Sequence, residues 1–443
     1  MRRGCVLGRA GWLAAVPIWF FLAVASLRAA DVQNPLPVSP ADDDVVLVAQ
    51  QPKAGAGSGP ARTPPVAKPT PPPVATPTPP VAPEPAERPA PFPPPDRLAS
   101  TSPIARGSLT RLASVPNMFG DFLNQNGQVQ IVGPNNVALA SDLPGAGGSR
   151  LKIAENNKAL PMDRVYLMYN HYENALQADL DLTTPGGLTN RPVDRYVVGM
   201  EKKFLGDRWS IDLRMPLTNR YRVETTEFEL SGGSVGDLSI ALKRLLLATE
   251  TSALAVGLAL DVPTGSDVDG RIGKTLFTVR NQAVHLGPFV GALLTPTDHV
   301  FCQGFLQIDV AANGEPVDYT DLGNNVSGEL GRLNDQTLFY VDLCVGYWLT
   351  RNPAATLSGM ACLAEFHYTG SLQGADVVSG KVNNVDLNFG NLLGEIDVPN
   401  VTLGLHAELN HRTEIRVGGV FPLRDRPNRA FDAEAQVSVN RRF

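Results

Sequence analysis

Beyond residue 30, the sequence has no run of 18 apolar residues, so no transmembrane helix is expected there. Cysteine is also scarce, and only Cys302, Cys344 and Cys362 follow residue 30. An odd number of cysteines in an oxidising compartment leaves at least one thiol unpaired. The net charge of −6 is mild, and no basic run with interleaved aromatics occurs. The charge pattern therefore argues against a nucleic-acid partner.

Motifs that would indicate catalysis or a metal site are also missing. The patterns G-x-S-x-G, H-E-x-x-H and G-x-x-x-x-G-K-[ST] do not occur. No cysteine or histidine spacing indicates zinc. A barrel phospholipase would need a His–Ser pair, and no serine can be placed beside His406. We therefore expect no enzyme, assign no catalytic residue, and expect no cofactor and no metal.

The N-terminus has the pattern of a secretory signal peptide, which we place at residues 1–30. Arg2, Arg3 and Arg9 precede an apolar stretch over residues 12–27, and small residues follow it. The alternative is a retained membrane anchor, which Pro17 and the short apolar length disfavour. Export across the inner membrane is the expected consequence.

Residues 31–103 are predicted to be a disordered acidic and proline-rich tether in the periplasm. Of the 38 prolines in the chain, 18 lie between Pro52 and Pro95. This composition cannot bury a core and favours extended polyproline II. Two interpretations remain open: a spacer that touches peptidoglycan or a periplasmic protein, and a passive disordered spacer.

From Asp163 onward, apolar and polar residues alternate over long runs, which is typical of β-strands. In residues 401–410, Val401, Leu403 and Leu405 share one face, and Thr402, His406 and Glu408 share the other. Residues 237–246, 251–263 and 432–440 repeat this pattern. We predict strands that begin near Asp163, Arg195, Trp209, Val235, Thr251, Ala283, Asp298, Gln336, Ala354, Asn400, Arg412 and Asp432.

The connections between these strands alternate between short and long. Short ones are expected at residues 205–207, 248–250, 295–297, 351–353 and 410–411. Long ones are expected near 177–194, 217–234, 264–282, 314–335 and 371–399, with a shorter one at 424–431. Bacterial outer-membrane barrels have this rhythm of short periplasmic turns and long loops. The predicted fold is thus all-β: a 12-stranded antiparallel up-and-down transmembrane β-barrel over residues 163–443, in the outer membrane.

A secreted sandwich or propeller is the alternative fold, because alternation alone does not show which face meets the core. Many predicted strands have 10 to 14 residues, whereas globular strands average about 5 to 6. We therefore favour a barrel whose apolar face meets outer-membrane lipid. Trp209, Tyr347, Trp348 and Phe421 are candidates for interface girdles, although two or three of them could equally fill the lumen.

Charged residues on the polar faces are the candidates for lining the lumen. Both signs occur, so they either set the selectivity of a narrow pore or pair into a satisfied network. They are Glu201, Lys203, Asp212, Arg214, Asp237, Lys243, Asp261, Asp309, Asp342, Glu408, Arg416 and Glu434.

Residues 104–162 precede the first predicted strand. The apolar stretch at 114–122 and the charged Lys152, Glu155 and Lys158 suit either a plug inside the lumen or a periplasmic lead-in. Cys344 and Cys362 fall on neighbouring predicted strands and could face each other. The simpler interpretation is that both are small apolar residues of their strands.

The final strand, AEAQVSVNRRF, resembles the C-terminal signature of outer-membrane proteins, which the barrel-assembly machinery reads. This resemblance makes Phe443 the candidate assembly signal. Four further segments resemble the barrel family named for the MetA pathway of phenol degradation, which includes many uncharacterised barrels of planctomycete-like bacteria. They are LKIAENNKALPMDRVYLMYNH (151–171), GDLSIALKRLLL (236–247), LALDVPTGSD (258–267) and PFVGALLTP (288–296). The resemblance covers roughly residues 115–443 and implies transport of small compounds, hydrophobic ones included, across the outer membrane.

Two functions follow from these expectations. The first is a narrow outer-membrane channel or uptake barrel. The second is a structural anchor whose tether holds the cell wall or a periplasmic partner, without transport.

Overall fold

The computed structural model describes residues 111–443, except for 122–127, 133–137, 140, 143–149, 180–187, 220, 225–227, 233–234, 375, 384, 391–393 and 426–427. The predicted signal peptide, the tether and residues 104–110 lie outside the described residues. None of the described residues belongs to a helix long and apolar enough to span a membrane.

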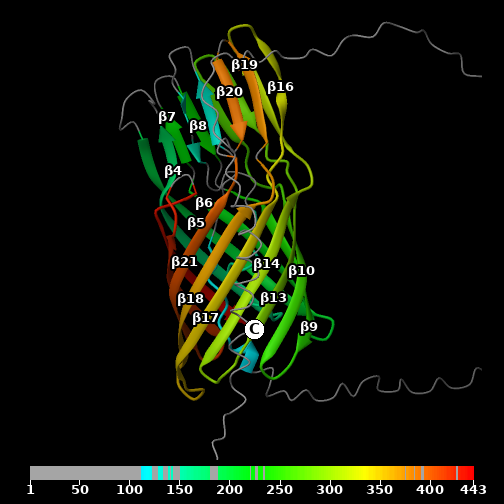
Figure 1. The fold of residues 1–443 in the computed structure, drawn as a ribbon, viewed down its shortest axis with the longest axis vertical. Coiled ribbons are helices and arrows are strands. Elements are labelled where there is room, and N and C mark those ends of the chain that lie inside the picture. The colour runs from blue at the N-terminus through cyan, green and yellow to red at the C-terminus, as the bar shows by residue number, and fades with distance from the viewer. Residues whose placement is uncertain are drawn as a thin grey trace, which may run out of the picture. The chain divides into compact units, whose positions relative to one another are not determined.

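Twelve strands of the described residues close into an antiparallel barrel (Figure 1). They are β4 (Arg164–Asp179), β5 (Leu188–Phe204), β6 (Trp209–Thr218), β9 (Leu238–Ala248), β10 (Ser252–Val262), β13 (His285–Leu294), β14 (Val300–Ala311), β17 (Leu338–Arg351), β18 (Leu357–Ser371), β21 (Asp397–Leu409), β22 (Thr413–Pro422) and β23 (Ala433–Arg442). Each pairs with its neighbour along this order. The last strand pairs with the first from Ala433↔Glu173 to Arg442↔Arg164, so the barrel has no free edge. The predicted fold class is confirmed.

The direction of the side chains is that of a barrel in lipid. On β21, Leu403 and Leu405 are 54% and 56% exposed, while Thr402 before them and His406 after them are fully buried. Val198 on β5 and Val417 on β22 are equally exposed. The interior instead collects charged and polar side chains. Hydrocarbon solvates the outer apolar face, and strand closure satisfies the backbone groups that lipid cannot.

Two of the girdle candidates point outward, and one does not. Tyr347 and Phe421 are 47% and 50% exposed. Trp348 is buried in the lumen, where its ring meets His406 edge to face at 5.7 Å between ring centroids. The cysteines follow the same alternation: Cys344 is buried on the inner face, and half-buried Cys362 lies opposite Tyr347. The three cysteines after residue 30 are free thiols.

The long connections fold into β-hairpins at one end of the barrel (Figure 1). We call these hairpins the collar: β7 (Tyr221–Glu224), β8 (Phe228–Gly232), β11 (Val268–Ile272), β12 (Thr275–Val279), β15 (Glu315–Asp321), β16 (Val326–Leu333), β19 (Val377–Val382) and β20 (Val385–Gly390). Six of them form one sheet in the order β16-β15-β12-β11-β8-β7. Hydrophobic side chains of the collar, including Phe277, Val317, Leu387 and Phe389, pack into a core with Tyr172 of β4.

The N-terminal segment runs through the barrel twice. At the short-turn end, Arg111 Nη2 donates to the carbonyl of Thr295, in the turn between β13 and β14, at 3.0 Å. The chain reaches the collar as β1 (Gln128–Val132), β2 (Ala138–Leu139) and β3 (Ser141–Asp142). There, β1 pairs with β20 and β3 pairs with β4. Residues 150–162 then return to the short-turn end, where β4 begins. We call residues 111–121 and 150–162 the plug, and name them its first and second pass.

Candidate functional site

The candidate site is the lumen, where wall side chains hold the backbone of the plug. Neither pass belongs to a strand, so its N–H and C=O groups need other partners inside the barrel. Glu365 accepts from the N–H groups of Phe119 and Gly120 at 2.8 and 2.9 Å. Gln307 accepts from Ile153 N at 2.7 Å and donates to Leu151 O at 2.6 Å. The wall thus replaces the ladder that a sheet would provide.

Arg416 and Phe119 fix the first pass on the side of β21 and β22. Arg416 Nη1 donates to the carbonyls of Asn117 and Met118 at 2.8 and 2.6 Å, and its guanidinium lies 5.1 Å from the ring centroid of Phe119. The ring of Phe119 covers Gly404 and Gly418, which pair across the two strands. Two adjacent glycines therefore leave the hollow in which this ring lies.

Positive charge concentrates on the wall near β4, β5 and β6. Glu201 is buried there, and its carboxylate accepts hydrogen bonds from Arg164 Nε at 3.0 Å and Ser210 Oγ at 2.7 Å. It also forms an ion pair with Lys243 Nζ at 3.0 Å. Arg214 Nε and Nη2 both donate to Asp212 Oδ2, at 3.0 and 2.8 Å. This pairing satisfies charges that water does not reach.

The second pass brings a complementary charge to this side of the lumen. Arg195 forms a buried ion pair with Glu155, including an Nη2–Oε2 bond of 3.2 Å. Arg214 Nη1 donates to the carbonyl of Glu155 at 2.9 Å. Glu155 thus binds two wall arginines, Arg195 through its carboxylate and Arg214 through its backbone carbonyl.

Negative charge concentrates on the opposite wall, from β10 to β18. Asp261 accepts from Leu151 N at 2.7 Å. Arg150 of the second pass lies 3.4 Å from Asp309 (Nε–Oδ1) and 3.7 Å from Asp335 (Nη2–Oδ2). The plug therefore presents Arg150 to the acidic wall and its Glu155 carboxylate to the basic wall.

Lys152 is a second plug cation that is buried at the acidic wall. Its Nζ lies 2.9 Å from Asp342 Oδ1 and 3.4 Å from Thr369 Oγ1, and it also bonds Asp121 of the first pass. The Tyr340 ring lies beneath it, 5.4 Å from Nζ to the ring centroid. One buried ammonium therefore joins both passes of the plug to β17 and β18.

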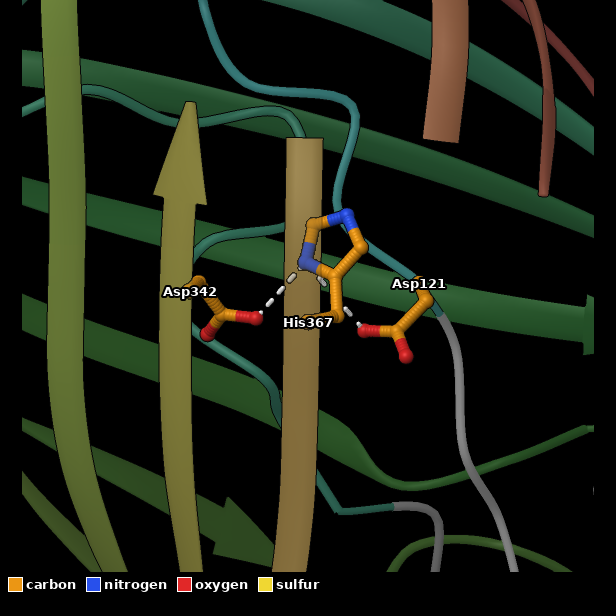
Figure 2. A group of neighbouring side chains, drawn as sticks. All are labelled: Asp121, Asp342 and His367. Atoms are coloured by element: carbon orange, nitrogen blue, oxygen red, sulfur yellow. Dashed lines mark hydrogen bonds and ion pairs between the residues drawn. The ribbon is translucent and has the colours of Figure 1, made fainter. Parts of the chain in front are cut away.

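Figure 2 shows Asp121, Asp342 and His367 converging. Asp121 and Asp342 are the two carboxylates that Lys152 bonds. His367 Nδ1 lies 2.8 Å from Asp342 Oδ1 and 3.6 Å from Asp121 Oδ1. These three residues have the composition of a divalent-metal site, and their candidate ligand atoms lie within 4.8 Å of one another. The ammonium of Lys152 already supplies a cation to both carboxylates, at the position where a metal ion would otherwise meet them.

The structure buries most of the predicted lumen residues. Eleven are at most 5% exposed: Glu201, Asp212, Arg214, Asp237, Lys243, Asp261, Asp309, Asp342, Glu408, Arg416 and Glu434. Lys203 instead lies at the short-turn rim, where Nζ is 3.6 Å from Asp163 and 3.4 Å from Asp207, and its side chain keeps 25% exposure. Phe443 is 62% exposed at the same end.

Asp237 has a local role at the collar end of the barrel. Its Oδ1 accepts from the N–H groups of Thr264 and Gly265 at 3.0 and 2.8 Å, and from Asn281 Nδ2 at 2.6 Å. This carboxylate therefore holds the Pro263-Thr264-Gly265 turn to the start of β9. A Cβ at Gly265 would lie 2.9 Å from the same oxygen.

Several site residues are not among the sequence-based candidates. Glu365, His367 and Thr369 alternate along β18 and face the lumen together, so the period of two in residues 357–371 carried the signal. Asp121, Arg150 and Arg164 lie outside the alternating runs or at their start, and no local pattern marks them as partners of the wall.

Fold and lumen together define a plugged 12-stranded β-barrel of the outer-membrane type. No protein-family model and no curated protein sequence matches the chain. Among solved structures, it is similar to an outer-membrane channel from Pseudomonas putida F1, with 11% identity, 65% of this chain and 97% of that chain covered, and a TM-score of 0.41. It is also similar to the toluene transporter TodX of P. putida (10% identity, 68% and 95% covered, TM-score 0.35) and to the NanC porin (7%, 63% and 98%, TM-score 0.35).

Proposed function

We propose that this protein is a narrow outer-membrane channel for small compounds, hydrophobic ones included, and that the plug gates it. The observation that carries the proposal is that charged side chains of the wall bind the plug. Asp342, Glu365, Arg195 and Arg416 make their bonds to a separate segment of chain in the lumen. If the plug moves, these groups line a polar passage.

The resemblance to the MetA-pathway barrels points to the same class of function. In this proposal, the short turns face the periplasm, as in other outer-membrane barrels. Arg111 lies at the short-turn end, so the tether would leave on the periplasmic side. The barrel-assembly machinery would read Phe443 at that same end.

Planar-bilayer recording of the refolded full-length protein tests this function. We expect brief, discrete openings in the unaltered protein and longer openings when a plug contact is removed. Arg416→Ala removes the two bonds to the carbonyls of Asn117 and Met118 and is the first variant to test. If neither protein conducts while both remain folded, the channel proposal fails.

A structural anchor is the second candidate function. The observation that favours it is the filling of the barrel: both passes are buried, and the collar closes over a hydrophobic core. A barrel that stays silent in the bilayer, and that pulls down peptidoglycan or a periplasmic protein through residues 31–103, would support the anchor.

A further inference from the structure

The surroundings of Lys152 have the chemistry of an ammonium-binding site. We name Asp342, Thr369 and Tyr340 the ammonium seat. It offers a carboxylate oxygen at 2.9 Å, a hydroxyl at 3.4 Å and an aromatic face at 5.4 Å from Nζ. An alkylammonium has three N–H donors and is attracted to the face of an aromatic ring. All three groups of the seat belong to β17 and β18, so they remain on the wall if the plug leaves.

The second observation is that one oxygen of the seat's carboxylate has no hydrogen-bond partner among the described residues. Asp342 is fully buried, and its Oδ1 is used by His367 and Lys152. Its Oδ2 has no hydrogen-bond partner among the described residues. A buried carboxylate that loses its only primary ammonium is strongly destabilised, so withdrawal of Lys152 leaves a site that demands a cation.

The aromatic member of the seat points to an organic cation. A hard divalent metal takes oxygen ligands and gains little from a ring at 5.4 Å. The apolar side of the lumen, with Phe289, Phe305 and Leu293, suits the body of a molecule whose charged head binds at the seat.

We propose that the ammonium seat binds the amino group of a small alkylamine, and that Lys152 is an internal occupant which such a substrate replaces when the second pass moves. The proposal rests on the proposed channel function for its role in transport. Binding itself does not require that the barrel conducts. Lys152 then acts as a tethered competitor that keeps the seat filled while the plug is in place.

Replacement of the internal ligand tests the proposal directly. The full-length K152A variant is refolded in detergent, and the midpoint of its heat-dependent gel shift is measured with n-butylamine, which is protonated at pH 7. The neutral, similarly shaped n-butanol serves as the ligand control. We expect butylamine, and not butanol, to raise the midpoint of K152A in a saturable manner and to leave the unaltered protein unchanged. An equal response to both compounds, or none, overturns the proposal.

Lys158 offers the matched control variant. Its ammonium is also buried, but it donates to the carbonyls of Ala113 and Val115, both at 2.7 Å, and no aromatic face lies beneath it among the described contacts. K158A should gain no stability from butylamine. The double variant K152A/D342N should lose the response of K152A, because the carboxylate of the seat is gone.

A measurement on a protein that keeps Lys152 and, of the three free thiols, only Cys344 covers the case in which K152A does not fold. Cys344 is 2% exposed and lies beneath the plug, so a polar thiol reagent reaches it only after the plug moves. Butylamine at concentrations well above those that saturate K152A should compete with Lys152 and speed this labelling, and butanol should not. Equal rates with both additives would refute the seat. Amine binding to a silent barrel would instead refute only the channel, and conduction without amine binding would refute only the seat.

Discussion

The ring of Phe119 rests directly on the backbone of Gly404. A Cβ at Gly404 would lie 2.3 Å from two carbons of this ring, and one at the neighbouring Gly418 would lie 2.9 Å from another. Real carbon atoms do not approach so closely, so the glycine pair is a condition for docking the first pass of the plug.

Gly404→Ala should therefore loosen the plug. Overpacking of this kind costs about 1–3 kcal/mol, which changes the equilibrium between plugged and open states by roughly 5- to 150-fold. Longer open times in bilayer recordings would report it. Gly374→Ala is the control, because a Cβ there meets open space. In F119A/G404A the clash is absent, so the double variant should open no more than F119A alone.

Leu405→Arg should destabilise the barrel by about 2–4 kcal/mol, because a charged group near mid-strand would face hydrocarbon. The measurement is the free energy of unfolding in lipid vesicles by denaturant titration. Leu322 is similarly exposed at 50% but lies in the turn between β15 and β16 of the collar. Leu322→Arg should change this free energy by less than about 0.5 kcal/mol. Equal costs at both positions would contradict the assignment of the outer face.

Cys344 should resist polar thiol reagents in the native state. A variant that keeps only this cysteine should be labelled slowly, and Glu365→Gln, which weakens the anchoring of Phe119 and Gly120, should speed labelling. Each decrease of about 1.4 kcal/mol in the free energy of plug opening corresponds to a roughly tenfold faster labelling rate. Rapid labelling of Cys344 in the unaltered plug would show that the lumen is open to the reagent without plug movement.

The turn of the β15–β16 hairpin should loosen in acid. The amide of Asn383, the side chain of Asn324 and the N–H groups of Asn324 and Gly323 hydrogen-bond Asp321, and they lower the pKa of its carboxyl. A folded-state pKa below the unfolded value means that the stabilisation is present above the unfolded pKa and is lost as the pH falls through the folded pKa.

Hydrogen exchange checks this expectation for the collar. Amide protection of residues 321–325 should be constant from pH 7 down to about pH 4, the ordinary range of an aspartate, and should fall below it after correction for intrinsic rates. Asp321→Asn should remove the pH dependence. Unchanged protection near pH 2 would mean that this carboxylate does not hold the turn.

The barrel could be predicted from the sequence because its signal is local. Alternation such as that of residues 401–410 reports one apolar and one polar face, and the rhythm of turns gives the strand order. All twelve strands appear in the predicted order. β6 begins at Trp209 as expected, whereas β5 begins at Leu188, ahead of the predicted start near Arg195. The ends of β4 and β5 differ from the prediction because both strands extend into the segment expected to be a loop at 177–194.

The sequence-based prediction does not contain the collar. The collar strands are short, and they lie in the segments that are predicted to be long connections. Gly273 and Asn383 have φ values of +53° and +51°, at the turns of the β11–β12 and β19–β20 hairpins. The pairs Gly273-Lys274 and Asn383-Asn384 between short β-prone runs were the available signal.

The contacts of the plug could not be predicted in the same way. Lys152 and Asp342 are 190 residues apart, and no periodicity links a non-repetitive segment to one strand of a wall. The charges of the polar faces were visible in the sequence, but their partners depend on the path of the chain through the lumen.

That path constrains how the molecule is put together. Strands β1, β2 and β3 lie at the collar end, whereas Arg111 before them and Arg164 after them both lie at the short-turn end. If β23 had already joined β4, this length of chain would have to be threaded through a closed barrel. We therefore expect β1, β2 and β3 to cross to the far side while the first and last strands are still apart, so that the barrel closes around a chain that already passes through it.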